Sequence, residues 1–253
     1  MAELKIANQW PWKQAPVCLV TGATRGIGRA VAGDLARSGA IVFFAGRDPD
    51  AVARSVREAS AAGGDARPLV VDVSDVTSIR AGAAAVDAGA GRLDVLVNNA
   101  AAYVDWTETA LSADLEETRK VMDTNLFGPW AMVQAFLPLL QRSDHPRVVN
   151  VGSGAGSHGD TQFGLTSRRG AAASYGVSKA AVLALTAAFA AELADTPVIV
   201  NAVDPFLTAT WPGAEQMGAR PVADSVPGIV WAATLPDDGP RGGFFRDGTA
   251  LPW

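Results

Sequence analysis

The 253-residue chain has few of the residues that hold metals or cross-link a fold. It contains one cysteine, Cys18, and only two histidines, His145 and His158. A single cysteine cannot form an internal disulfide, and without a Cys/His cluster we expect no metal site. Cys18 stands in an apolar run, where a small buried side chain is the expected role.

Basic clusters and long apolar runs are also missing. The 21 Lys and Arg are scattered among 26 Asp and Glu, giving a net charge of −5. Nucleic-acid binding needs clustered positive charge, so we expect none. No apolar stretch is long enough to cross a bilayer without Gly, Pro or charge interrupting it, and residues 1–16 lack the apolar core of a signal peptide. These absences favour a cytoplasmic protein without a membrane partner.

Short β-branched runs alternate with Ala-rich segments along the rest of the chain. Near-continuous apolar runs predict buried parallel strands at residues 17–20, 41–45, 68–73, 93–97, 147–151 and 197–203, with a last edge strand at 244–246. Helical spacing predicts helices at 27–38, 49–62, 74–88, 113–140, 175–194 and 221–234. This alternation is typical of right-handed βαβ units. We therefore expect a three-layer Rossmann fold, a doubly wound parallel sheet of about seven strands with helices on both faces.

Several boundaries carry their own signals. Asp48 before Pro49 is typical of a helix N-cap, and Ser74 is the predicted cap of the following helix. No repeat or linker divides the chain, so a 1–16 extension should precede a single domain at 17–253.

A glycine-rich segment follows the first strand and opens the first helix. It reads Thr21-Gly22-Ala23-Thr24-Arg25-Gly26-Ile27-Gly28. Glycines let the backbone approach a pyrophosphate, and a helix N-terminus supplies free N–H groups. Glycines also mark ordinary turns, but the place between strand and helix favours a dinucleotide site. The expected contacts are Gly22, Thr24, Arg25, Gly26, Ile27 and Gly28.

The end of the second strand bears on the choice of cofactor. An NAD enzyme places a carboxylate there, whereas this chain has Gly46 and Arg47. Arg47 can pair with a 2′-phosphate, and Arg25 could converge on the same group. The alternative is two ordinary surface arginines. We predict NADP(H), with Asp72 and Val73 at the adenine, although Asp72 could be a turn residue.

Tyr175 and Lys179 are four residues apart, which places them on one face of a helix. A tyrosine with a pKa near 10 is a poor base, and a neighbouring ammonium would lower that pKa. The same spacing could also be a packed tyrosine beside a solvated lysine. Its place in the helix after the fifth strand favours the catalytic interpretation.

Polar residues at strand ends complete the candidate site. Ser153 follows the fifth strand, where its hydroxyl could bond a carbonyl oxygen. Asn125 lies within a predicted helix, where Asn is an indifferent helix former, and it could hold a water beyond Lys179. Asn98-Asn99-Ala100 ends the fourth strand, and we expect Asn99 and Ala100 to contact the cofactor rather than form a simple turn.

Together these residues, in this order, resemble the short-chain dehydrogenase/reductase family over nearly the whole chain from Val17. The Gly46-Arg47 pair and the ending Gly243-Phe244-Phe245…Leu251-Pro252-Trp253 are similar to its NADP-dependent carbonyl reductases. The resemblance implies Tyr175 as general acid in reduction, Lys179 on the nicotinamide ribose, Ser153 orienting the carbonyl and Asn125 completing a tetrad. Tyr175 and Lys179 thus also count as cofactor contacts, and so do Pro205, Thr208 and Thr210.

The chain departs from the family pattern on the substrate side. Ala101 replaces a usual glycine, and Phe206 stands where glycine is usual. The Phe206 ring would narrow the pocket or shield the hydride face, or the loop would change, because glycine often takes a φ > 0 that phenylalanine resists. Residues 154–174 make a lengthened substrate loop, or alternatively a mobile surface loop, and 205–234 a substrate-side lid region. The pocket walls we expect are Tyr103, Trp106, Phe163, Phe206 and Trp211, although any could be core.

The function predicted from these residues is reversible NADPH-dependent reduction of a ketone or aldehyde. The alternatives are a non-catalytic NADP-sensing regulatory protein and an alcohol dehydrogenase acting mainly in oxidation. The expected partners are a small-molecule substrate and further copies of the chain, in a dimer or tetramer, with a monomer as the alternative.

Overall fold

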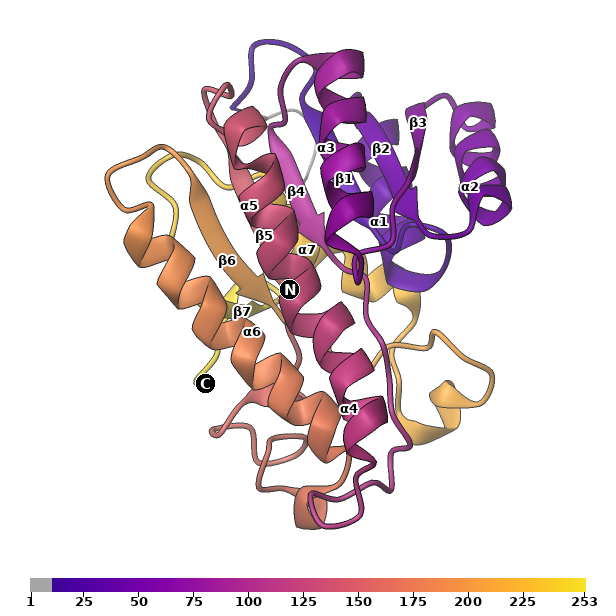
Figure 1. The fold of residues 1–253 in the computed structure, drawn as a ribbon, viewed down its shortest axis with the longest axis vertical. Helices are drawn as coiled ribbons and strands as arrows, with labels where there is room; N and C mark the ends of the chain where they lie inside the picture. The colour runs from indigo at the N-terminus through magenta and orange to yellow at the C-terminus, as the bar shows by residue number, and fades with distance from the viewer. Residues whose placement is uncertain (1–10) are drawn as a thin grey trace.

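The computed structural model describes residues 11–253, so most of the predicted 1–16 extension lies outside the described residues. These residues form a single sheet with the strand order β3-β2-β1-β4-β5-β6-β7-β8 (Figure 1). The strands are β1 (Val17–Thr21), β2 (Ile41–Gly46), β3 (Asp65–Val70), β4 (Val95–Asn98), β5 (Arg147–Val151), β6 (Ile199–Val203), β7 (Phe244–Arg246) and β8 (Thr249–Ala250).

Helices cover both faces of the sheet. They are α1 (Gly26–Arg37), α2 (Pro49–Ala61), α3 (Val76–Ala90), α4 (Leu115–Met122), α5 (Gly128–Leu140), α6 (Ala173–Glu192) and α7 (Val222–Ala233). Figure 1 shows α3, α5 and α6 on the face turned toward the viewer. Leu19 of β1 packs in the core of that face, and its neighbour Val20 packs in the opposite core with α1 and α7. Alternate residues of a strand point to opposite faces, so the runs must be apolar throughout.

The predicted three-layer Rossmann fold is confirmed, with a different strand count. Seven strands are parallel, and the eighth, β8, pairs antiparallel with β7 through Phe245 and Ala250. Asp48 caps α2 as predicted, accepting from the amides of Asp50 and Ala51. The prediction that Ser74 caps α3 is wrong. The cap is Asp75, whose carboxylate accepts from the Thr77 amide, because α3 begins two residues later than expected.

Two predicted element boundaries are also wrong. β3 covers Asp65–Val70 rather than 68–73, because the strand stops where its partner β2 ends at Gly46. The single helix expected at 113–140 is interrupted by a π-helical turn at Asp123–Phe127, between α4 and α5. A π turn inserts an extra residue into the helix and is frequent at functional sites.

By length and hydropathy, α6 is the one helix of residues 11–253 that could cross a membrane. About half of its apolar window (56%) is buried within the protein. Its side chains Leu185 and Phe189 pack in the core. A core helix of this kind meets the same length and hydropathy criteria, so α6 carries no argument for a membrane.

Candidate active site

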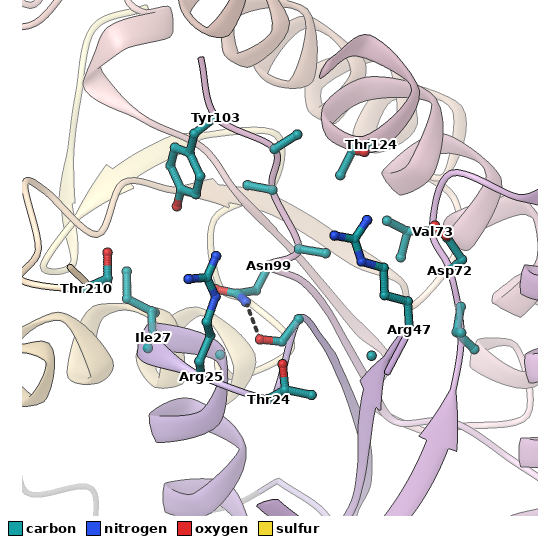
Figure 2. Close-up of a pocket in the computed structure, with 18 of the residues that line it drawn as sticks. Thr24, Arg25, Ile27, Arg47, Asp72, Val73, Asn99, Tyr103, Thr124 and Thr210 are labelled. Atoms are coloured by element: carbon teal, nitrogen blue, oxygen red, sulfur yellow. Dashed lines mark hydrogen bonds between the residues drawn. The ribbon is translucent and has the colours of Figure 1, made fainter. Parts of the chain in front are cut away.

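A cleft of about 460 Å³ opens at the carboxyl ends of β1, β2 and β4 (Figure 2). Open α/β sheets bind their ligands at this edge. Twelve predicted cofactor contacts line the cleft: Gly22, Thr24, Arg25, Gly26, Ile27, Gly28, Arg47, Asp72, Val73, Asn99, Ala100 and Thr210. The lining also contains Gly46, Val71, Ala101, Ala102 and Thr124. The sequence predicts no role for three of these five, Val71, Ala102 and Thr124, because none is charged and none belongs to a cofactor-binding motif.

The glycine loop is packed too closely for larger residues. A Cβ on Gly28 would lie 2.4 Å from the Gly22 carbonyl oxygen and 2.3 Å from the Asn99 amide nitrogen. A Cβ on Gly22 would lie 2.9 Å from the Ala100 Cα, and Gly22 has φ = +64°. Both glycines are therefore required by the loop itself, which brings the start of α1 against the end of β4.

The cleft has the charge to bind an anionic dinucleotide. The N-cap of α1 is Arg25, which makes no side-chain capping bond. The first amides of the helix therefore lack a capping side chain. Figure 2 shows the Arg25 and Arg47 guanidinium groups pointing into the cleft on either side of Asn99. Neither arginine has an ion-pair partner within 4 Å among the described residues. The residues present thus fit a phosphorylated nucleotide.

Asn99 and Asp72 are both fixed by hydrogen bonds at the cleft. The Asn99 side chain donates to the Thr21 carbonyl at 2.9 Å. The Asp72 carboxylate accepts from the hydroxyl of Ser74 at 2.6 Å and from its amide at 2.9 Å. These bonds, with a smaller contribution from Arg47, lower the pKa of Asp72. Asn98, by contrast, is buried and donates to Asn150 instead of facing the cleft.

Tyr175 and Lys179 lie in the first two turns of α6, and both are buried. The Lys179 ammonium donates to the Val151 carbonyl at 2.8 Å and lies 5.7 Å from the centre of the Tyr175 ring. Burial lowers the pKa of Lys179 to about 8, against the opposing effect of Asp204. The helix spacing has therefore brought the phenol and the ammonium together at the end of β5.

The expectation that Lys179 lowers the pKa of Tyr175 is not met in this structure. Burial, and then Tyr103, raise that pKa well above its usual value, although the Ser153 hydroxyl acts in the opposite direction. The reason is desolvation, which favours the neutral phenol. A neutral phenol is the proton-donating form. Ser153 follows β5, and its Oγ also accepts from the Ala155 amide at 3.2 Å.

Asn125 lies in the π turn and has protein partners rather than a free side chain. Its Oδ1 accepts from the Ala102 amide at 2.7 Å, and its Nδ2 donates to the Ala102 carbonyl and the Ser178 hydroxyl, each at 3.0 Å. It thereby joins the loop after β4 to the middle of the Tyr175…Lys179 turn. These direct bonds connect two segments of the site, and the role of holding a water stays a prediction.

The comparisons with known proteins agree with this geometry. The model of the short-chain dehydrogenase family matches residues 16–217, most of the chain. The chain belongs to the short-chain dehydrogenase family.

Relatives within this family include several reductases. A rhamnolipid-biosynthesis 3-oxoacyl-[acyl-carrier-protein] reductase of Pseudomonas aeruginosa is 36% identical over 193 residues, covering 75% of this chain and 71% of that protein. The crystal structure of NADPH-bound carbonyl reductase from chicken fatty liver has a TM-score of 0.83 and 27% identity, covering 95% of this chain and 100% of that one. A 3-oxoacyl-[acyl-carrier protein] reductase with bound NAD from Brucella melitensis has a TM-score of 0.81 and 28% identity, with 98% of each chain covered.

In this member of the family, the tyrosine lies beneath aromatic side chains. Tyr103 stacks on the Tyr175 ring with centroids 5.5 Å apart and planes at 20°, and Trp106 meets its edge at 5.5 Å. Trp211 stacks on Trp106 at 6.2 Å. These three of the five predicted pocket walls line the cleft. Phe163 and Phe206 instead pack against each other at 5.6 Å, outside the cleft lining.

The loop that carries Tyr103 and Trp106 also caps α6, the helix that carries Tyr175 and Lys179. The Glu108 carboxylate accepts from the amide of Ser174 at 2.9 Å and from its hydroxyl at 2.6 Å. The α6 N-cap residue, Ala172, has φ = +55° and supplies no capping side chain. Glu108 takes that place from 66 residues away, and the residue that it binds, Ser174, directly precedes Tyr175. Sequence reasoning missed it, because capping signals are local and this contact is not.

The turn after β6 places the remaining predicted contacts differently. Thr210 lines the cleft, whereas Pro205 and Thr208 do not. Thr208 is buried, and its hydroxyl bonds to the Ser225 hydroxyl at 2.7 Å and to the carbonyls of Pro205 and Phe206. It holds the turn together from within. Phe206 has a positive φ, +59°.

Proposed function

We propose that this dehydrogenase catalyses the reversible, NADPH-dependent reduction of a small-molecule ketone or aldehyde to an alcohol. One arrangement supports this most: the Ser153 hydroxyl acts on the pKa of Tyr175, and Lys179 lies one turn along α6, beside a cleft suited to a phosphorylated nucleotide. Reductases of acyl and carbonyl groups among the relatives support the same direction.

In the proposed reaction, bound NADPH supplies a hydride to the carbonyl carbon. Tyr175 donates its phenolic proton to the carbonyl oxygen, so that a hydride and a proton together yield the alcohol. Ser153 donates a hydrogen bond to the same oxygen and stabilises the charge that develops there. Lys179 binds the nicotinamide ribose and, as an ammonium, favours the phenolate that remains. Oxidation runs through the same groups in reverse, with Tyr175 as the base.

The preference for NADPH is proposed from the two arginines. Arg47 follows β2 directly, where no carboxylate stands to repel a 2′-phosphate, and Arg25 faces it across the cleft (Figure 2). A guanidinium can bind a phosphate through two parallel hydrogen bonds. The relatives bind either NADPH or NAD. Family membership therefore does not decide between NADPH and NAD, and the proposed preference for NADPH is based on Arg25 and Arg47.

We also propose that the chain forms a dimer or tetramer through α4, α5 and α6. Phe127 in the π turn, Trp130 in α5 and Val177 in α6 are exposed. Apolar side chains gathered on one surface mark interaction sites. Size-exclusion chromatography with light scattering will test this, and a monomer at micromolar concentration would contradict it.

The proposed reaction is tested with purified protein, NADPH and a panel of aromatic and aliphatic ketones, following NADPH absorbance. We expect turnover with at least one ketone, and Tyr175→Phe should lower kcat by about 10²–10⁴-fold while NADPH binding, measured by calorimetry, is retained. Equal turnover in the variant would remove Tyr175 from the mechanism. NADPH binding without turnover of any carbonyl or alcohol would favour the NADP-sensing alternative.

A further inference from the structure

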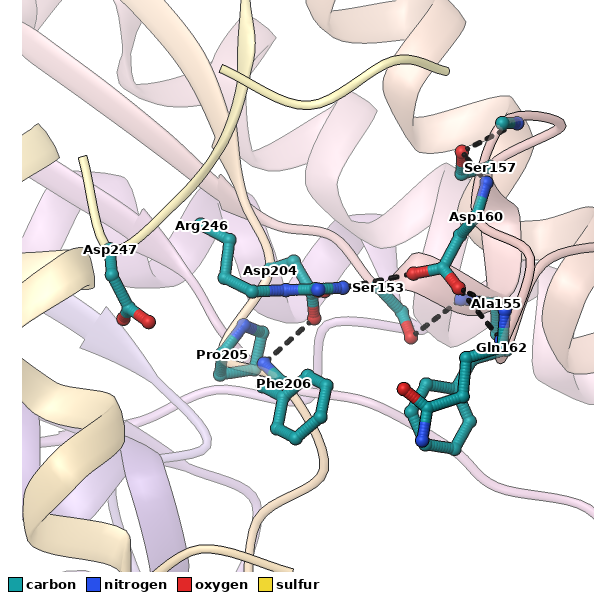
Figure 3. Close-up of polar contacts among 12 residues, drawn as sticks. Ser153, Ala155, Ser157, Asp160, Gln162, Asp204, Pro205, Phe206, Arg246 and Asp247 are labelled. Atoms are coloured by element: carbon teal, nitrogen blue, oxygen red, sulfur yellow. Dashed lines mark hydrogen bonds and ion pairs between the residues drawn. The ribbon is translucent and has the colours of Figure 1, made fainter. Parts of the chain in front are cut away.

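Arg246, at the end of β7, lies between two carboxylates from distant parts of the chain (Figure 3). Its Nε donates to Asp204 Oδ2 at 2.9 Å, and its Nη2 donates to the same oxygen at 2.5 Å and to Asp160 Oδ2 at 3.0 Å. The exposed fraction of the side chain is 24% for Arg246, 13% for Asp160 and 3% for Asp204. One shielded cation thus bridges two shielded anions.

Asp160 belongs to the 154–174 loop and determines its local shape. Its second oxygen, Oδ1, accepts from the amides of Gln162 and Phe163 at 2.9 and 2.8 Å. These bonds turn the chain so that the Phe163 ring meets the Phe206 ring edge-on at 5.6 Å. A single carboxylate therefore bends the loop and ties it to Arg246.

Asp204 holds the other side of this contact. Its Oδ1 accepts from the Phe206 amide at 2.8 Å, and the Arg246 guanidinium lies 4.8 Å from the centre of the Phe206 ring. Phe206 has φ = +59°, a conformation that costs a phenylalanine free energy unless its surroundings hold it. The Asp204 bond and the cation–π contact help to hold it here, together with the Thr208 hydroxyl, which donates to the Phe206 carbonyl.

The ion triad also lies directly against the backbone that follows Ser153. A Cβ on Gly154 would lie 2.6 Å from Asp160 Oδ2 and 3.1 Å from Arg246 Nη2. Only a glycine leaves room for this approach. Figure 3 shows Ser153 beside the Asp160 carboxylate, with Ser153 and Phe206 both below the Arg246 guanidinium in this view.

We propose that the Asp160–Arg246–Asp204 triad latches the 154–174 loop onto the Pro205–Phe206 turn. The latch fixes the Phe163–Phe206 wall beside Ser153 and makes Arg246 a specificity-determining residue for substrate size. The assignment to substrate size rests on the proposed function, whereas the latch itself does not. Arg246 acts through the loop and the turn, so it is a positioning residue.

The surroundings favour the charged forms of Asp160 and Arg246. Although burial opposes ionisation, bonds from the Phe163 amide and from Arg246 hold the pKa of Asp160 below its usual value. Burial likewise opposes the charge on Arg246, and Asp204 and Asp160 together outweigh it and raise its pKa. Removing one partner from such a set leaves a shielded charge uncompensated. Loss of Arg246 should therefore release the loop rather than leave it in place.

Loop opening can be measured without any enzymatic reaction. Arg168 and Arg169 are exposed in this loop and are cleavage sites for trypsin. In Arg246→Gln and in Asp160→Asn, we expect cleavage after these arginines to be about tenfold faster, which corresponds to about 1.4 kcal/mol of local stability. Asp160→Asn keeps an oxygen for the Gln162 and Phe163 amides and so removes only the ionic bond. The control is Arg142→Gln, which breaks an exposed pair with Asp87 far from the site and should leave cleavage at 168–169 unchanged.

The double variant Asp160→Asn/Arg246→Gln should be cleaved no faster than the faster single variant, because both remove one shared contact. With ketone substrates, we expect kcat/KM for bulky aryl ketones to rise at least fivefold relative to small aliphatic ketones. NADPH affinity should change by less than twofold, since none of the three residues lines the cleft.

Unchanged trypsin cleavage in the folded Asp160→Asn variant would overturn the latch. If Arg246→Gln does not fold, the Asp160→Asn variant alone provides the test. Faster cleavage with an unchanged ratio of bulky to small ketones would overturn the assignment to substrate size. Absence of ketone reduction in the wild-type protein would count against the proposed function alone, because the trypsin result is independent of turnover.

Discussion

Two parts of this molecule hold their irregular backbone in different ways. The first is residues 11–150, which carry most of the cleft lining and are here called the cofactor side. The second is residues 151–253, which carry the 154–174 loop and the Pro205–Phe206 turn and are here called the substrate side. Between residues 11 and 150, every residue with a positive φ is a glycine: Gly22, Gly26, Gly39, Gly63 and Gly91. Beyond residue 150, five positive-φ residues carry side chains: Arg168, Arg169, Ala172, Phe206 and Asp247. The cofactor side thus adopts its turns without strain. On the substrate side, ion pairs, the Glu108 cap and aromatic contacts surround the strained positions. The backbone conformation of this side therefore depends on tertiary contacts.

The largest effect is expected when a methyl group is added to the glycine loop on the cofactor side. Gly28→Ala should lower NADPH affinity at least a hundredfold and the free energy of unfolding by about 1–3 kcal/mol, because its Cβ meets the Gly22 carbonyl. Calorimetry and chemical denaturation measure the two effects. Gly33→Ala, in the same helix, meets only the flexible end of Arg37 at 3.3 Å and should stabilise α1 by about 0.5–1 kcal/mol. Equal effects of the two variants would contradict the assigned packing.

Arg47→Ala tests whether the cofactor side also selects by charge. We expect NADPH affinity to fall by about 10–150-fold while NADH affinity barely changes, since charged hydrogen bonds are worth about 1.5–3 kcal/mol. Competition binding with both nucleotides measures the preference. Arg29→Ala is the control, because Arg29 lies on α1 in an exposed pair with Glu58. An unchanged preference in Arg47→Ala would end the assignment to NADPH.

Glu108 variants test the substrate side, where the cap of α6 comes from a residue outside that helix. Glu108→Ala should lower kcat about tenfold, because a small displacement of Tyr175 is costly for catalysis, and KM should change less. Glu108→Gln keeps the accepting oxygen and should restore most of kcat. Asp114→Ala removes the local cap of α4 and should cost similar stability, about 1 kcal/mol, without lowering kcat. Parallel losses of kcat in both alanine variants would point to general destabilisation instead.

The smallest effect is expected where strain and packing oppose each other. Phe206→Ala removes the ring contacts with Phe163 and Arg246 but keeps the positive φ, whereas Phe206→Gly also relieves the backbone. We expect the glycine variant to be more stable than the alanine variant by about 1 kcal/mol. Thermal and urea denaturation of both variants measure this difference. Equal stability would mean that the turn relaxes to a negative φ once the ring is gone.

The layers and the glycine loop could be read from the sequence because their signals are local. Buried parallel strands must be apolar on both faces, and the Asp48-Pro49 cap depends on residues one turn apart. The end of β3 could not be found in this way, because its apolar run continues past the last residue that pairs with β2. The π turn at Asn125 was missed for a related reason, since the helical pattern continues through it.

The candidate catalytic residues were predictable by type and order, but their surroundings were not. Spacing placed Tyr175 beside Lys179, yet the raised pKa of Tyr175 comes from burial and then from Tyr103, 72 positions earlier. Arg246 meets Asp160 across 86 positions and Asp204 across 42. Such contacts follow from the order of strands in the sheet, which a single sequence specifies only through the whole fold.

The stacked indoles of Trp106 and Trp211 give this protein a built-in optical reporter. They lie 6.2 Å apart at the end of the cleft, with Trp106 against the catalytic phenol. A molecule bound against Tyr175 would lie next to Trp106 and so change the polarity around the stacked rings. Intrinsic tryptophan emission should therefore shift as substrate enters, so that loading of the site can be timed in a stopped-flow instrument without a label.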